Sequence, residues 1–185
     1  TLVNRFVINF SKTGGLGRLT RWILEKYVEP RFHGCISRNN AMSQKESCLV
    51  PRNQEMYNAF GYIKNRLSDT DILHEYFIPH DQFVPFVDGL REVVKRNNAN
   101  LLNITIRIVS KDTITALPYA KDDRFAFVLY FNQRLNDKES EILEKTTVDL
   151  INLAIDLGGS YYLPYQLYYS PDQLRKAYPE IDTFF

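Results

Sequence analysis

The chain has 185 residues, of which 44% are hydrophobic and 14% aromatic, so it can bury one sizeable core. It carries 23 Lys and Arg against 22 Asp and Glu, and this net charge of +1 argues against a dedicated nucleic-acid binder. No apolar run is long enough to span a bilayer, and we expect neither a membrane span nor a signal peptide.

The cysteines and histidines predict no metal site. Cys35 and Cys48 are too few for a disulfide scaffold, and neither forms a metal-ligand spacing with His33, His74 or His80. We therefore expect a reducing, cytoplasmic environment. The protein would be peripheral to the membrane if its basic segment contacts lipid.

The charge is distributed unevenly along the chain. Residues 1–66 hold 11 Lys and Arg against 4 Asp and Glu, a net charge of +7, and residues 67–185 hold 12 against 18, a net charge of −6. We expect a basic helical connecting segment over 1–66, followed by an acidic domain over 67–185. Because the chain begins at Thr1 and ends at Phe185 within an apparent helix, we expect it to be part of a larger protein.

Helical patterns open the basic segment. Gly14, Gly15 and Gly17 break the pattern into two pieces, the second near Arg18–Val28 and halted by Pro30. No Gly-Lys-Ser/Thr follows these glycines, so a helix break is a better interpretation than a phosphate loop. The polar stretch from residue 31 to residue 66 predicts an irregular connection.

The acidic domain shows six main elements in a regular order. They are a strand at Asp71–Ile78, a helix at His80–Asn98, strands at Leu101–Val109 and Arg124–Phe131, a helix at Asn136–Leu157 and a strand at Tyr161–Gln166, with a short helix capped by Ser170 after them. The order β-α-β-β-α-β predicts an α+β, ferredoxin-like fold, with one antiparallel sheet and both helices on one of its faces.

Alternation along the strands assigns residues to the two faces of this sheet. In the second strand, Ile104, Ile106 and Ile108, with Leu102, share the helix-packed side, and Asn103, Thr105 and Arg107 share the open side. The open face is expected to be aromatic with a few polar groups. Such a face suits a flat ligand or another domain, and it suits equally a dimer of two such sheets.

Four phrases of the acidic domain resemble one family. They are DTDILHEYFIP at 69–79, NITIR at 103–107, FAFVLYF at 125–131, and GGSYYLPY at 158–165 followed by Leu174, Tyr178 and Pro179. Together they resemble the FAD-linked oxidases of the vanillyl-alcohol oxidase type, with the alditol, sugar-lactone and decaprenylphosphoryl-ribose oxidases nearest. The resemblance covers residues 67–185 well and residues 1–66 only loosely.

This resemblance implies an oxidoreductase whose FAD is held mainly by a separate FAD-binding domain, absent from this chain. Residues 67–185 would be the ferredoxin-like cap that binds a sugar-, polyol- or lactone-like small molecule. A hydroxyl of that substrate would be oxidised by hydride transfer to the flavin. The expected partners are the substrate and the protein's own FAD-binding domain, and this chain alone is expected to be inactive.

The resemblance also assigns individual residues. Arg107 matches a cation that can stabilise a reduced flavin or a substrate alkoxide, and Tyr165 matches a catalytic Lys position. Thr105 and Phe127 stand where alditol oxidases carry a Glu and a His, so their polyol-recognition set is not intact. The expected catalytic residues are Arg107, Tyr165 and Glu75, with Arg107 also facing the cofactor, and the expected substrate-binding residues are Thr105, Phe127, Gln166 and Tyr168.

Other interpretations stay open at this point. Arg107 and Glu75 could form ordinary ion pairs, Tyr165 could simply pack, and His74 alternates onto the helix-packed side as a core or edge residue. The whole domain could be a non-catalytic ferredoxin-like module that dimerises through its aromatic face. The basic segment could face the FAD domain, lie on an anionic membrane surface, or be a solvated helix face.

Overall fold

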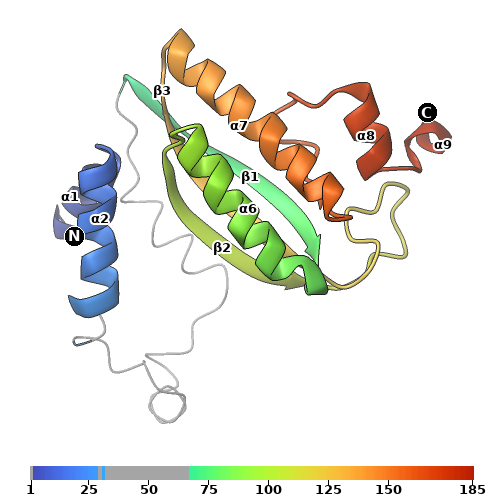
Figure 1. Ribbon diagram of the computed structural model, residues 1–185, viewed down its shortest axis with the longest axis horizontal. Coiled ribbons are helices and arrows are strands. Elements are labelled where there is room, and N and C mark those ends of the chain that lie inside the picture. The colour runs from blue at the N-terminus through green and yellow to red at the C-terminus, as the bar shows by residue number, and fades with distance from the viewer. Residues whose placement is uncertain (1, 29–30, 32–66) are drawn as a thin grey trace. The chain divides into compact units, whose positions relative to one another are not determined.

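The computed structural model describes residues 2–28, 31 and 67–185 (Figure 1). The chain divides into two compact units, Thr1–Arg66 and Leu67–Phe185. Their boundary is also the boundary between the basic segment and the acidic domain. The expected irregular connection lies almost wholly outside the described residues, as do Cys35, Cys48 and His33.

The described part of the first unit is helical. It contains α1 (Leu2–Ser11), α2 (Gly15–Ile23) and a π-helical turn, η1 (Leu24–Val28). The predicted break is confirmed at Gly14, whose φ of 114° lies in the region that favours glycine. The second helix begins at Gly15, earlier than predicted, and Gly17 lies within it. A Cβ on Gly17 would lie 2.0 Å from the carbonyl oxygen of Phe10, so this glycine lets α2 approach α1 closely.

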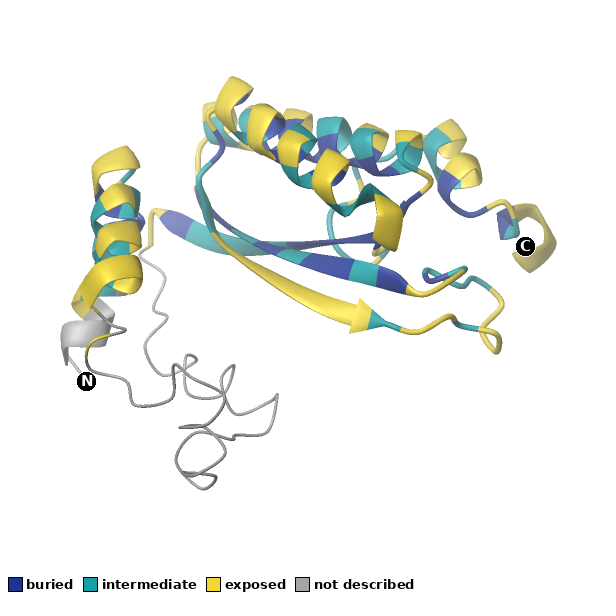
Figure 2. Cartoon of the chain, turned by 60° about the horizontal axis from the view of Figure 1, so that its bottom comes forward, coloured by how far each residue is buried: buried dark blue, intermediate teal, exposed yellow. Residues whose placement is uncertain are grey.

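The second unit has the predicted α+β, ferredoxin-like arrangement. Its elements are β1 (Asp69–Pro79), η3 (His80–Gln82), α6 (Phe83–Arg96), β2 (Leu101–Val109), β3 (Arg124–Arg134), α7 (Asp137–Asp156), β4 (Ser160–Tyr161), α8 (Pro171–Ala177) and α9 (Ile181–Phe184). The strand order is β2-β3-β1-β4, with every neighbouring pair antiparallel. Helices α6 and α7 cover the same face of the sheet (Figures 1 and 2).

The core lies between this helical layer and the sheet. The predicted apolar face of α6 is confirmed, with Phe86, Leu90 and Val93 buried. The sheet meets the helices through alternate residues of β1 and β3. The pairs Tyr76–Phe127 and Ile78–Phe125 stand side by side across the two strands, as period-two alternation predicts.

The fourth strand is much shorter than predicted. The sequence predicts it over Tyr161–Gln166, but β4 ends at Tyr161, and its last ladder bond runs from the Tyr162 N–H to the Glu75 carbonyl. Pro164 has no N–H to donate, so the chain turns away from the sheet here. The outer edge of β1 before Tyr76, at His74 and Glu75, is therefore left without a full partner strand, and a pocket can form there.

The start of the second strand also differs from the prediction. The register shifts between Leu101 and Asn103, which places Leu101 opposite Phe131 on the core side. Leu102, predicted on that side, is the extra residue of a bulge. A bulge adds one residue to the strand and so reverses the alternation of the residues before it. Leu101 therefore takes the core side that the sequence predicts for Leu102.

The three isoleucines of β2 lie on the helical side, as predicted, but they are not buried. Ile104, Ile106 and Ile108 stand opposite Leu129, Phe127 and Phe125, and all three are exposed. Because β2 is the edge strand, α6 and α7 leave it uncovered (Figure 2). The alternation along a strand thus predicts which face of the sheet a side chain points to. The side chain is buried only where a helix also covers that part of the face.

The close packing after α7 gives a testable prediction. A Cβ on Gly159 would lie 2.8 Å from the backbone oxygens of both Ala154 and Phe77, which cannot move aside as a side chain can. Gly159→Ala should lower the free energy of unfolding by about 2 kcal/mol, measured by urea titration. Gly15→Ala, where a Cβ meets open space, is the control and should change it by less than about 0.5 kcal/mol. Equal effects would contradict this account of the packing.

Candidate functional site

An ion pair stands on the open face of the sheet. Arg107 of β2 donates from Nη2 to Oε1 of Glu75 on β1, reaching across β3. The Glu75 side chain is 7% exposed and the Arg107 side chain 43% exposed. The guanidinium therefore covers the carboxylate while part of it still faces solvent, where it can meet a ligand.

Tyr165 completes a group of three polar side chains. It lies in the segment after β4, and its ring packs edge-on against Tyr162 with centroids 5.1 Å apart. Burial raises the pKa of the Tyr165 hydroxyl, and the negative charge of Glu75 adds to the rise while Arg107 opposes it. Tyr165 therefore stays protonated near neutral pH and can donate a hydrogen bond. The three expected catalytic residues thus come together.

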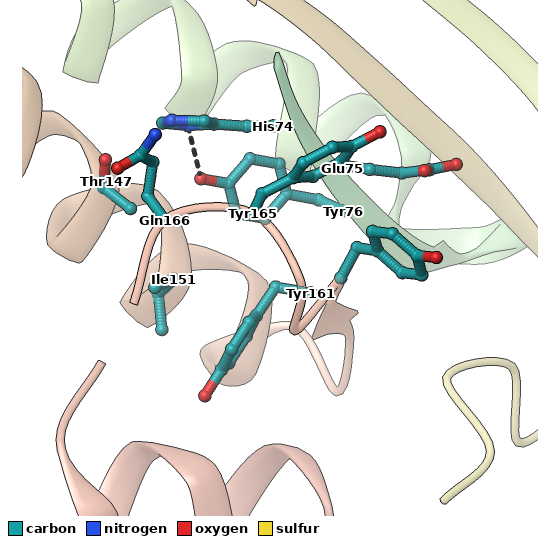
Figure 3. A pocket seen from close by; sticks show the side chains of 9 residues that line it. His74, Glu75, Tyr76, Thr147, Ile151, Tyr161, Tyr165 and Gln166 are labelled. Carbon is teal, nitrogen blue, oxygen red and sulfur yellow. Dashed lines mark hydrogen bonds between the residues drawn. The ribbon is translucent and has the colours of Figure 1, made fainter. Parts of the chain in front are cut away.

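A pocket opens beside this group, along the free edge of β1 (Figure 3). Strand β1 contributes His74, Glu75 and Tyr76, α7 contributes Thr147 and Ile151, and the segment after β4 contributes Tyr165 and Gln166. Its enclosed space is about 10 Å³, room for a single water molecule, and the rest of the hollow is open to solvent. The early end of β4 creates this pocket, because a full-length strand would fill the edge of β1.

Aromatic rings cover the open face at the end near Pro79. Phe77 stacks on Tyr119 with centroids 4.4 Å apart, and Tyr162 meets both rings edge-on. As a result Phe77 is buried although it points away from the helices. The expectation of an aromatic open face holds here, with rings supplied largely by the connections rather than by the strands.

The expected substrate-binding residues are distributed differently. Thr105 lies exposed on the open face, opposite Val128, and Gln166 lines the pocket. Tyr168 is not among the residues that line the pocket. Phe127 is fully buried on the other face of the sheet, against Phe83 and Phe86. It is therefore a core residue and does not belong to this group.

Sequence reasoning missed Val128. By register Val128 stands between Glu75 and Thr105, at the centre of the open face. The signal was present in the alternation of β3, where Phe125, Phe127 and Leu129 share one side and Val128 the other. Matching to a family position by sequence gave Phe127, one residue away and on the helix-packed face.

His74 is a core residue at the back of the pocket, as its alternation predicts. It is buried, its ring lies 5.0 Å from that of Phe131, and its Nδ1 hydrogen bonds with the Tyr76 hydroxyl at 3.2 Å. Figure 3 shows the Gln166 amide beside the ring. Burial lowers the pKa of His74 to about 4. The imidazole is therefore neutral at physiological pH.

This buried histidine predicts a pH dependence of stability. As pH falls from 6.5 towards 4, the unfolded chain binds a proton at His74 that the folded chain does not, so the free energy of unfolding falls by about 3 kcal/mol over this window. His74→Gln should remove this part of the pH dependence in urea titrations. His80→Gln, at an exposed histidine, should leave it intact. Parallel curves for the wild type and His74→Gln would contradict the prediction.

Two features are absent from the part of the chain that the structure describes. No group of three or more His, Cys, Asp or Glu side chains is placed to hold a metal ion. No helix among the described residues is long and apolar enough to cross a membrane.

Comparisons with known proteins identify no family for this chain. No family model and no curated protein matches it. Among solved structures, it is similar to a C-terminal segment of the alpha subunit of aIF2 from Pyrococcus abyssi, with a TM-score of 0.28 and 15% identity over 86% of this chain and 91% of that one. A TM-score this low does not establish a shared fold, so any functional assignment depends on the site itself.

Proposed function

We propose that residues 67–185 form the substrate-binding cap of an FAD-dependent oxidoreductase that oxidises a hydroxyl of a sugar-, polyol- or lactone-like molecule. The four phrases that resemble FAD-linked oxidases support this proposal, and the ferredoxin-like fold is compatible with it. The observation that carries it is the cluster of Glu75, Arg107 and Tyr165 on the open face, beside a pocket.

The described residues fit the flavin-ring end of FAD and do not fit its diphosphate. The Gly14 region is a helix break, and the described residues offer no glycine-rich cradle for the FAD diphosphate, which the proposal assigns to a separate FAD-binding domain. The partly exposed guanidinium of Arg107 fits the ring end, because a cation there would stabilise negative charge on the reduced ring or on the substrate oxygen.

Each of the three polar groups has a distinct chemical role in this proposal. When bound, FAD supplies the acceptor for the hydride that leaves the carbinol carbon. Arg107 would stabilise the negative charge that develops on the substrate oxygen as the hydroxyl proton leaves to solvent, and Glu75, which the guanidinium covers, would hold Arg107 in place. Tyr165, held protonated, donates a hydrogen bond that orients the hydroxyl. The rings of Tyr119 and Tyr162 pack against Phe77 beside this group.

On this proposal the chain is part of a longer protein that also contains the FAD-binding domain, and that full-length protein tests it. We expect it to show flavin absorbance after purification or after addition of FAD, and to lose that absorbance anaerobically with a sugar lactone, an aldose or an alditol. The present chain alone should bind FAD poorly and should reduce none. Full-length protein without flavin absorbance after FAD addition would overturn the proposal. The cytoplasmic location expected from the sequence stays a prediction, which cell fractionation would check.

The alternative is a non-catalytic module that dimerises through its open face. Phe77 is already covered by Tyr119 within the chain, so less aromatic surface is left for a second copy than the sequence implies. Sedimentation velocity separates the two proposals. A tight dimer that dissociates on Tyr165→Glu would favour the module, and a monomer would favour the cap.

A further inference from the structure

The helix α2 and the turn η1 carry apolar side chains on their outward side. Leu16, Leu19, Trp22, Ile23 and Tyr27 are between 42% and 72% exposed. Their spacing of three and four residues places them on one side of the helix. These side chains therefore form a single apolar strip, which we call the α2 strip.

Among the described residues, the α2 strip is not the face through which α2 packs against α1. That face contains Gly17, which is buried against the backbone of Phe10 in α1. A surface helix ordinarily turns its apolar side inward and its polar side to water. Here, among the described residues, the small residue faces α1 and the large apolar residues face away from it, so the strip is open to another surface.

Positive charge lies beside the strip. Arg18, Arg21 and Lys26 lie on α2 and η1 with Glu25 as the one acidic side chain between residues 15 and 28, and Arg21 pairs with Glu25 at 2.6 Å. The Lys26 ammonium lies 4.6 Å from the centre of the Trp22 ring. The segment 1–66 as a whole has a net charge of +7.

From these observations we propose that the α2 strip binds the surface of anionic phospholipid membranes. Large apolar side chains would enter the boundary between headgroups and acyl chains, with Trp22 and Tyr27 at headgroup depth. Arg18 and Lys26 would meet the lipid phosphates. The charge favours anionic lipid over a neutral surface, and this inference does not depend on the flavin chemistry proposed above.

The chain contains a natural probe of this contact. Trp22 is its only tryptophan and lies within the strip, so its fluorescence reports the strip alone. With vesicles of phosphatidylcholine and phosphatidylglycerol, the full chain should co-float, shift its emission to shorter wavelength and be quenched by brominated acyl chains. Binding to phosphatidylcholine alone should be at least about tenfold weaker, and added salt should weaken binding to the anionic vesicles.

Two variants separate the contribution of the apolar side chains to membrane binding from the contribution of the positive charges. Leu19→Glu should lower the apparent affinity for anionic vesicles about tenfold or more. Lys26→Glu should lower it at least about fivefold, since each basic residue near such a surface contributes about 1 kcal/mol. Val84→Glu is the matched control, because Val84 is a 64% exposed apolar residue on α6, outside the strip. The control should bind as the wild type does.

Three results would overturn the inference. Trp22 emission that is already at short wavelength and protected from acrylamide without vesicles would mean that the chain covers the strip itself. A shift that depends on protein concentration without lipid would assign the strip to a second copy. Equal binding of Leu19→Glu, Val84→Glu and the wild type would remove the strip from membrane binding.

Discussion

Replacing Arg107 with alanine in the FAD-loaded, full-length protein should slow substrate-driven flavin reduction by about 10²- to 10³-fold. Arg107 is the cation that the open face presents beside Glu75 and Tyr165, and in the proposed reaction its charge stabilises the developing alkoxide. Anaerobic stopped-flow absorbance measures the rate directly. Arg91→Ala is a suitable control, because Arg91 is exposed on α6, on the helical side, and pairs with Asp88.

The loss of rate must be separated from a loss of folding. Arg107→Ala leaves the Glu75 carboxylate buried without its cation, which should lower the free energy of unfolding by roughly 1–3 kcal/mol. The double variant Glu75→Gln/Arg107→Ala should recover part of this stability but none of the rate. Arg107→Lys should recover part of both. Unchanged flavin reduction in folded Arg107→Ala would remove this residue from the mechanism.

The elements that the sequence predicted correctly are those with strong local signals. Helix α7 begins where Asn136 accepts a hydrogen bond from the Glu139 N–H and ends before Gly158, whose φ is 69°. Helix α8 begins with a capping box formed by Ser170 and Gln173. Such caps depend on residues a few positions apart, so the sequence contains all the information needed.

The features that the sequence predicted wrongly or left open have two causes. A run of tyrosines favours a strand over Tyr161–Gln166, but Pro164 cannot donate to the ladder, and this local signal against the strand was outweighed. The ion pair of Glu75 and Arg107 joins residues 32 positions apart across β3. Alternation along each strand predicts that Glu75 and Arg107 share a face of the sheet. Whether the two charges meet depends on the register of β1, β2 and β3, which local sequence does not determine.

Phe127→Ala should lower the free energy of unfolding of the isolated chain by about 3–5 kcal/mol. Phe127 is fully buried and its ring contacts those of Phe83 and Phe86, at centroid distances of 5.3 and 4.7 Å. Its removal leaves a cavity that the sheet and α6 cannot close. Urea titration measures the loss, and the melting temperature should fall by about 10 °C.

Two further variants test whether Phe127 belongs to the core or to the substrate site. Phe127→Leu, which keeps most of the volume, should cost less than about 1.5 kcal/mol. Val128→Ala, at the half-buried neighbour on the open face, should cost about 1 kcal/mol and alter flavin reduction in the full-length protein. If Phe127→Ala instead left stability within about 1 kcal/mol and changed substrate preference, Phe127 would belong to the substrate site and the register of β3 would be wrong. A large stability loss for Phe127→Ala with a rate effect for Val128→Ala would place the substrate on the face that carries Glu75 and Arg107.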